Sequence, residues 1–399
     1  MILSLLNKIA GLFEKDFLFA SFLPALIFMA AVAATLTGVV GFEASWSWID
    51  SWTALQKAVA AAGTGLAVIV FAYVLSVLRP VFLRFWSGTV DSWFLKPFLW
   101  PFFSLGKRFQ RYRYDRLRQK ENEPARWGKV QRDFRNLVNS RINDNRINDN
   151  LPGIPAKELN ALKLEIKISL EDADLSRFER IAGKIANLYA KYNENSLTDL
   201  YKLVYGNLND RVKYEEAPIR EARRERDWKF GGMASIQATD LGNIIEAYKA
   251  YPYERYGIEA EIFWPELHNV MPEDFLTLVD EPRILLDFSL AMASLLGVYG
   301  ILALFGGAWL WTNCLFWAIL AMVAFTGSYF FYRVGVTAVN QYSALYRASF
   351  DLFRLELMYK LYRNHPPKLS VEREQWKQLS QLALYGYSQD FDLRPRADH

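Results

Sequence analysis

The sequence predicts a mainly α-helical membrane protein with four transmembrane helices, arranged as two hairpins, and a cytoplasmic, mostly helical domain. The first observation is a set of four apolar stretches that contain no Asp, Glu, Lys, Arg or His. Each has close to the ~20 residues that a helix needs to cross a hydrocarbon core of ~30 Å. They run over Phe17–Val40, Ala58–Leu78, Phe288–Leu310 and Leu315–Tyr332.

The second observation is unequal charge between these stretches. Positive residues crowd the segment after the second span, whereas the loop 41–57 has two acidic residues and one lysine. Because Lys and Arg are retained on the cytoplasmic side, we expect the polar middle and both termini there, with the spans in the inner (plasma) membrane. The predicted domains are 1–83 (an interfacial helix and the first hairpin), 84–284 (the cytoplasmic domain), 285–333 (the second hairpin) and 334–399 (a cytoplasmic helical tail).

Composition excludes several kinds of site. Cys314 is the only cysteine, so neither an intrachain disulfide nor a cysteine-cluster metal site can form. The histidines are His268, His365 and His399. The sequence has no Walker loop, GxSxG, HExxH or kinase signature. We therefore expect no metal, no cofactor and no catalytic residue set.

An aromatic and then basic segment follows the second span, at 84–120. Pro97 and Pro101 argue against a fifth spanning helix there. The composition favours an elbow on the membrane surface, where aromatic side chains insert and cations meet anionic headgroups of the lipid bilayer. Nucleic-acid binding is the less favoured alternative, because topology already explains the cations. The predicted membrane-surface residues are Trp93, Phe94, Trp100, Lys107, Arg108, Arg111 and Arg113.

Small residues line part of the second span, as Ala61 and Gly65 with Ala62 and Gly63 between them. Such spacing allows close contact between helices. The favoured interpretation is packing against the first span. The alternative is a dimer interface.

Apolar periodicity predicts the remaining helices. The fourth span is expected to continue as one helix to about Tyr362, followed by a last helix from an N-cap at Ser370 to Tyr385, with Gly386 as its stop. A stripe over Asp174–Tyr192 predicts another helix. Ser196–Val204 is expected as a short helix, and the highly charged Arg211–Trp228 as a solvated helix or a linker. The tandem repeat Arg141–Asn145 and Arg146–Asn150 predicts a polar loop.

The segment Thr239–Pro272 is the densest candidate for function. It contains Leu241-Gly242-Asn243, Arg255-Tyr256-Gly257 and Trp264-Pro265. This pattern is similar to one found in uncharacterised bacterial multi-pass membrane proteins, a group without an assigned activity. The resemblance covers a small part of the chain and implies a domain type but no reaction.

Three interpretations of this segment stay open. The plainest is a compact structural segment that packs near the membrane, with Pro265 holding Trp264 in an extended conformation. The second is a ligand or partner pocket made by Asn243, Arg255, Tyr256 and Trp264, in which the guanidinium stacks or binds an acidic group. The third is an enzyme site around His268, with Glu266 and Asp274 as its carboxylates.

The favoured function is a non-enzymatic membrane scaffold or effector. Its cytoplasmic domain would bind a cytoplasmic protein partner or a ligand, and the helix of the fourth span would transmit the signal. Self-association is expected, by analogy with toxin-like or defence-like effectors that perturb membranes as oligomers. A channel or transporter subunit is the first alternative. Ionisable residues within spans mark most ion routes and are missing here, so a pore would need several copies.

Overall fold

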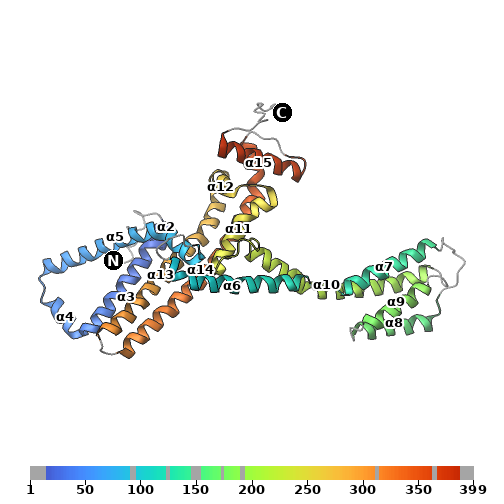
Figure 1. Ribbon diagram of the computed structural model, residues 1–399, viewed down its shortest axis with the longest axis horizontal. Helices are drawn as coiled ribbons and strands as arrows, with labels where there is room; N and C mark the ends of the chain where they lie inside the picture. Colours follow the sequence, from blue (N-terminus) through green and yellow to red (C-terminus); the bar gives the residue numbers. More distant parts are fainter. Residues whose placement is uncertain are drawn as a thin grey trace. The chain divides into compact units, whose positions relative to one another are not determined.

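The computed structural model describes residues 15–89, 96–122, 126–144, 154–171, 175–188, 194–310, 314–361 and 366–386. These residues form helices and contain no strand, as predicted (Figure 1). The elements are α2 (Lys15–Phe17), a π-helical turn η1 (Leu18–Phe22), α3 (Leu23–Val40), α4 (Phe42–Asp50), α5 (Ala54–Ser87), α6 (Lys96–Glu121), α7 (Arg126–Asp144), α8 (Ala156–Glu171), α9 (Leu175–Leu188), α10 (Glu194–Lys229), α11 (Asp240–Tyr256), α12 (Ala260–His268), α13 (Glu273–Leu310), α14 (Cys314–Lys360) and α15 (Leu369–Tyr385).

Four helical stretches are long and apolar enough to cross a membrane. They are Lys15–Val39, Ala54–Ser87, Glu273–Gly306 and Cys314–Lys360, and each overlaps one predicted span. The prediction of a multi-pass membrane protein is compatible with this finding. The pairing into hairpins and the sidedness stay predictions. The expected interfacial helix at Met1–Phe13 lies outside the described residues.

The chain divides into two compact units. Unit 1 comprises Met1–Tyr112 and Asp227–His399, and unit 2 comprises Arg113–Arg226. Among the described residues, all four apolar helices and the segment Thr239–Pro272 therefore belong to unit 1. The long helices α6 and α10 each begin in one unit and end in the other.

Apolar side chains pack where α3, α5 and α13 meet. Ala25 of α3 lies in a buried cluster with Val68, Ala72 and Leu75 of α5. The expected contact of Ala61 and Gly65 with the first span is not present. A methyl group added at Gly63 or Gly65 would meet nothing within 4 Å, and Ala61 and Ala62 are exposed. Packing begins nearer the C-terminal end of α5, where larger residues fill the contact.

Unit 2 is a small helical cluster. Its core contains Trp127, Val130, Phe134, Leu162, Ile166, Ile181, Ile185, Leu188, Val204, Leu208 and Val212. Leu175–Leu188 forms the helix that the apolar stripe predicts. Ser196–Val204 is helical but not a separate short helix, and Arg211–Trp228 is helical, because both lie within the continuous helix α10. Buried Val204 and Leu208 straddle Gly206, and their packing keeps the intervening turn helical.

The tandem repeat begins differently from the prediction. Arg141–Asp144 forms the last turn of α7, and the rest of the repeat lies outside the described residues. The repeat therefore starts in a helix and is not wholly a polar loop.

The fourth span continues into a long polar helix, as predicted. Helix α14 runs without interruption from Cys314 to Lys360. Helix α15 ends at Tyr385 and is capped by Gly386 in the left-handed conformation, also as predicted. Its start differs, since the N-cap is Lys368 and not Ser370.

Candidate functional site

The motif Leu-Gly-Asn marks the start of α11 and the place where α11 meets the end of α5. Thr239 is the N-cap, and its hydroxyl oxygen accepts from the Gly242 amide at 3.0 Å. The same hydroxyl donates to the carbonyl of Trp86 at 2.8 Å. A Cβ on Gly242 would lie 2.1 Å from the Ser87 carbonyl oxygen. Only a glycine lets the two backbones approach this closely.

Asn243 holds the loop that precedes α11. Its Oδ1 accepts from the Gln237 amide at 2.7 Å, and its Nδ2 donates to the carbonyls of Gln237 and Thr239 at 3.3 and 2.9 Å. The side chain is 2% exposed, so these internal bonds use its polar atoms fully. Asn243 therefore positions backbone in the structure and presents no free polar group to a ligand.

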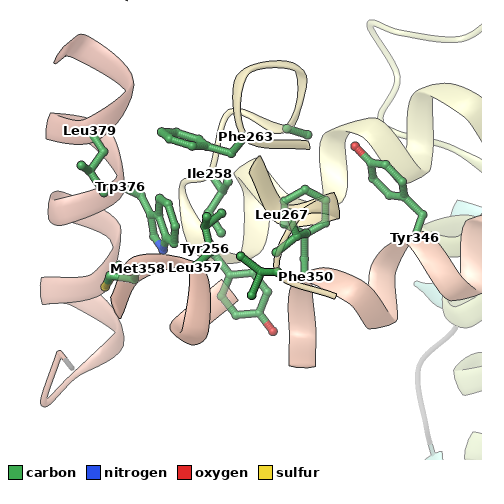
Figure 2. Packing of buried hydrophobic residues seen from close by; sticks show 12 residues of the cluster. Tyr256, Ile258, Phe263, Leu267, Tyr346, Phe350, Leu357, Met358, Trp376 and Leu379 are labelled. Atoms are coloured by element: carbon green, nitrogen blue, oxygen red, sulfur yellow. The ribbon is translucent and has the colours of Figure 1, made fainter. Parts of the chain in front are cut away.

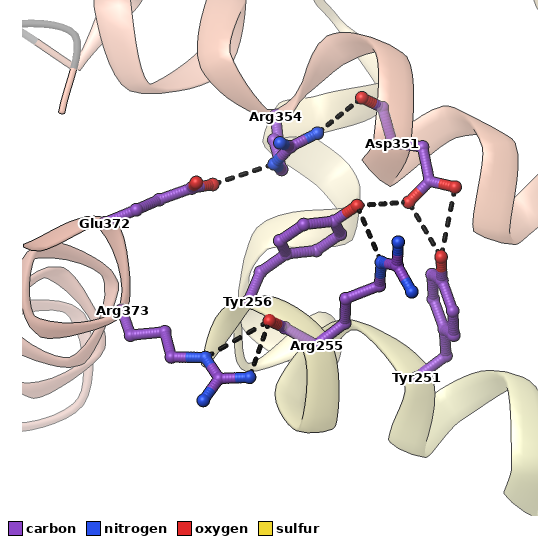
Figure 3. A network of polar contacts seen from close by, with 7 residues as sticks. All are labelled: Tyr251, Arg255, Tyr256, Asp351, Arg354, Glu372 and Arg373. Atoms are coloured by element: carbon purple, nitrogen blue, oxygen red, sulfur yellow. Dashed lines mark hydrogen bonds and ion pairs between the residues drawn. The ribbon is translucent and has the colours of Figure 1, made fainter. Parts of the chain in front are cut away.

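The motif Arg-Tyr-Gly marks the end of α11. Gly257 has φ of 76° and acts as a C-cap that lets the chain leave the helix. The neighbouring Tyr256 is buried, and its hydroxyl donates to the Asp351 carboxylate of α14 at 2.6 Å. Tyr251, one turn earlier, donates to the same carboxylate at 2.9 and 3.0 Å (Figure 3). Asp351 thus joins the C-terminal half of α11 to α14.

Arginine side chains extend this network to α15. Arg354 donates from Nε to the buried Glu372 carboxylate at 2.7 Å, and its guanidinium lies 4.0 Å from the centre of the Tyr256 ring. Arg373 donates to the carbonyl of Arg255 at the end of α11 (Figure 3) and also to that of Glu254. Helices α11, α14 and α15 are therefore linked by charge-assisted hydrogen bonds.

An apolar core lies beside the polar network. Figure 2 shows Trp376 of α15 among Phe263, Met358 and Leu379, and its side chain is fully buried. Trp264 stacks on Tyr346 of α14 with ring centres 4.4 Å apart. The expectation that Pro265 keeps Trp264 extended is wrong, because α12 includes both residues. Packing of α12 on α14 overrides the local preference for an extended backbone before proline.

A buried guanidinium connects the segment before α11 to α14. Arg347 is 8% exposed, and its guanidinium lies over the Trp228 ring at 4.4 Å and the Tyr251 ring at 5.3 Å. It also donates to the Trp228 carbonyl at 3.1 Å. Trp228 in turn donates from Nε1 to Asn340 at 3.2 Å. Aromatic faces thus provide much of the electrostatic environment of this cation.

The tyrosines of the network are held in their neutral form. Burial first, and then hydrogen bonding to Asp351, raises the pKa of both Tyr251 and Tyr256. The hydrogen bond to Tyr256 is the main cause that raises the pKa of Arg255. A neutral hydroxyl donating to a carboxylate is suited to fixing helices together, and neither tyrosine is poised to act as a base near neutral pH.

The four predicted pocket residues differ in what they offer a ligand. Asn243 and Tyr256 are buried, and Trp264 is half-buried against Tyr346. Arg255 is exposed, with its guanidinium over the rings of Tyr251 and Tyr256, and its Nε donates to Tyr256 at 3.2 Å. No hydrogen bond from its two terminal nitrogens is found within the described part of the chain. Arg255 is therefore the member best placed to receive an acidic partner.

The residues of the alternative enzyme site do not form an ordered set in this structure. His268 ends α12 half-buried, whereas Glu266 and Asp274 are exposed. Within the described ranges, no group of three or more His, Cys, Asp and Glu side chains is arranged to hold a metal ion. These positions offer no acid–base geometry from which to derive a reaction.

The predicted membrane-surface residues are distributed around α6. Trp93 and Phe94 lie outside the described residues. Trp100, Arg108 and Arg111 are exposed, and Lys107 and Arg113 are half-buried. Arg113 also lies 3.9 Å from Glu225 of α10. The helix itself is continuous through Pro101, so this part of the predicted elbow is helical.

Hydroxyl groups within the apolar helices bond mainly to helix carbonyls. Thr64 donates to the Ala60 carbonyl at 2.8 Å, Ser76 to that of Tyr73 at 2.7 Å, and Ser328 to that of Ala293 at 2.7 Å. Ser294 donates likewise to Leu290 and accepts from Trp86. These hydroxyls therefore have partners within the described helices.

Comparisons with protein-family models, with curated proteins and with solved structures gave no match. The function is therefore argued from the geometry of this chain alone.

Sequence reasoning missed the partners that complete the site. Asp351 and Arg354 are one turn apart on α14, and Glu372 follows on α15. They lie far along the chain from Tyr256, and charged residues on a long polar helix usually face solvent. The sequence offered one signal for these partners. Asp351 and Arg354 lie within one turn of each other, beside the aromatic residues of α14.

Proposed function

We propose that this chain is a non-enzymatic membrane scaffold or effector. Its polar helices α11, α12 and α15 would receive a cytoplasmic protein partner, and α14 would pass that event to the spanning helices. The bilayer is its permanent environment, and self-association is its expected working state. Cofactors have no part in this proposal.

The continuity of α14 is the observation that carries the proposal. Its apolar N-terminal part packs on α13, where Ser328 donates to the Ala293 carbonyl. Its polar C-terminal part bears Asp351 and Arg354, which bond α11 and α15. A displacement of either partner helix must therefore move the same rod that enters the apolar bundle, because one helix joins both.

A second joint lies at the start of α11. Here Gly242 lies against the end of α5, and Asp240 accepts from Gln110 of α6 at 2.9 Å. Helix α11 is thus fixed at one end to α5 and at the other to α14 and α15. A partner that tilts α11 would therefore displace both α5 and α14.

The exposed guanidinium of Arg255 suggests the chemistry of the partner. Acidic side chains or a chain carboxylate would pair with its two terminal nitrogens in a bidentate manner. Tyr253 nearby is 59% exposed and offers an aromatic contact. Aromatic and Arg side chains of this kind are typical of the centre of protein interfaces.

The test is the mass of the detergent-solubilised complex, with identification of proteins that purify with it. We expect an oligomer or a complex with a partner, which Arg255→Glu weakens at least tenfold. Arg224→Glu, at an exposed site in unit 2, is the control and should leave the complex intact. A monomer without a partner under all conditions would refute the proposal. Equal thermal midpoints of the two variants establish that Arg255→Glu acts on binding and not on folding.

A channel formed by several copies is the alternative that one observation favours. Residues 61–67 of α5 are exposed, and a Cβ added at Gly63 or Gly65 would meet nothing within 4 Å, so this surface is open to another copy. Ion flux into liposomes that contain the oligomer measures this alternative. Absence of flux in every oligomeric state would eliminate it.

A further inference from the structure

Helix α6 carries an apolar stripe that its own unit leaves uncovered. Phe102 is 74% exposed, Leu105 67%, Phe109 59% and Tyr112 65%. Their spacing of three, four and three residues places them on one side of the helix. Large side chains in this arrangement stand outside the apolar spanning segments and still need removal from water. Burial is worth about 1.5–3 kcal/mol for each such side chain.

The side of α6 next to the stripe is already packed. A Cβ on Gly106 would lie 2.5 Å from the Ala238 carbonyl oxygen, and Gln110 is buried and bonds Asp240. The helix is therefore fixed through one side, and it cannot rotate to bury the stripe formed by Phe102, Leu105, Phe109 and Tyr112. Among the described residues, none covers that stripe, so its burial calls for a partner beyond them.

The same contact places α6 next to the end of an apolar helix. Gly88, the C-cap of α5, lies against Ala238 as Gly106 does, with a Cβ at Gly88 only 2.9 Å from the Ala238 Cβ. The middle of α6 and the end of α5 thus both contact Ala238 and lie close together. If α5 spans a bilayer, this point lies at the boundary between lipid and water.

Charge on α6 completes the pattern. Arg108 and Arg111 are exposed and Lys107 is half-buried, whereas the range 96–112 contains no acidic residue. Each such cation near an anionic bilayer surface is worth about 1 kcal/mol. Apolar residues on one face and arginines beside them are typical of helices that lie in the membrane interface.

We propose that the stripe Phe102, Leu105, Phe109 and Tyr112 lies in the bilayer interface, with Arg108 and Arg111 bound to the phosphates of anionic lipids. The inference depends on the four spanning helices and is independent of a protein partner. Trp100, one of the predicted membrane-surface residues, lies on another side of the helix and is not part of this stripe. A second copy of this chain is the competing occupant of the stripe.

The test uses neighbouring positions of α6 in the full-length protein. In a Cys314→Ser background, a fluorophore is attached through Leu105→Cys on the stripe or Ser104→Cys beside it. The proteins are reconstituted in vesicles of phosphatidylcholine and phosphatidylglycerol. Nitroxide-labelled lipid should quench the label at position 105 severalfold more than the label at 104, and aqueous iodide should show the reverse order. Both side chains can change without loss of core, since neither is buried.

Each other outcome contradicts the proposal. Iodide quenching of position 105 as strong as that of 104 would show that the stripe faces water. Protection of position 105 from both quenchers would assign the stripe to a second copy. For the headgroups, nitroxide on phosphatidylglycerol should quench position 105 at least twofold more than nitroxide on phosphatidylcholine. Arg108→Gln with Arg111→Gln should abolish that preference, and equal quenching before the substitutions would refute the role of the arginines.

Discussion

Substitution of Gly242 by alanine tests whether α11 and α5 form a rigid joint. The added methyl carbon would lie 2.1 Å from the Ser87 carbonyl oxygen and 2.8 Å from the Gln237 Cβ. The first obstacle is backbone, so no side-chain rotation can relieve the clash. Helix α11 must move away from the end of α5, and the hydrogen bond from Thr239 to Trp86 must then lengthen.

The expected cost follows from opposing effects. Overpacking of a filled contact costs typically 1–3 kcal/mol, and a backbone obstacle places this case near 3. Alanine has a higher helix propensity than glycine, which stabilises the helix by up to about 1 kcal/mol. The net loss is therefore about 2 kcal/mol, which corresponds to a fall of about 3 °C in the thermal midpoint of a unit of this size.

The assay is thermal unfolding in detergent, followed by tryptophan fluorescence. Gly63→Ala is the matched control, because a Cβ there meets nothing within 4 Å and α5 is the same helix that Gly242 approaches. We expect Gly63→Ala to leave the midpoint unchanged or raise it slightly. An unchanged midpoint for Gly242→Ala would refute the close joint, and with it the mechanical argument for α11.

The remaining predictions concern the other buried contacts. Asp351→Ala removes the acceptor of two tyrosine hydroxyls and should destabilise unit 1 by about 2–3 kcal/mol, whereas Tyr251→Phe should cost about 1 kcal/mol, both by thermal unfolding. Burial, followed by the nearby Tyr342, raises the pKa of Tyr248 above the value of about 10 in an unfolded chain. Stability is therefore complete below pH ~10 and falls above it by up to about 1.4 kcal/mol per pH unit, and Tyr248→Phe should make the fall shallower. Trp228→Leu exposes the Arg347 guanidinium and should cost about 2 kcal/mol, with unfolding midpoints compared against Trp100→Leu, an exposed site. Equal midpoints for Trp228→Leu and Trp100→Leu would contradict the stacking argument.

The local sequence pattern predicted secondary structure correctly where a single physical effect, such as hydrophobicity, dominates. Apolar runs without charge predict long helices, and the continuation of the fourth span to Lys360 follows from a segment without Pro or a late Gly. Pattern failed where tertiary packing opposed it. A short helix is predicted at Ser196–Val204, yet α10 continues through Gly206, where buried Val204 and Leu208 pack on either side. The start of α15 likewise moved from Ser370 to Lys368.

The location of the candidate site could be predicted from the sequence, but the contacts of its side chains could not. The three short motifs stood out, and the structure gives Gly242 and Gly257 clear backbone roles at the ends of α11. The binding roles predicted for Asn243 and Tyr256 could not be judged from sequence, because burial and hydrogen-bond partners depend on chain segments brought together by folding. The role of Asp351 as an acceptor could not be predicted, because it depends on the packing of α14 against α11.

The sequence by itself determined that this chain is helical and has four stretches able to cross a membrane, because length and hydrophobicity are properties of consecutive residues. Tertiary structure alone decided which polar groups pair. It satisfied Asn243 internally, joined two tyrosines to Asp351, and left Arg255 open on the surface. It also decided that α6 buries Gln110 and exposes the stripe from Phe102 to Tyr112. Either face of an aromatic, basic helix can be the buried one, and only contact with Ala238 and Asp240 selects between them.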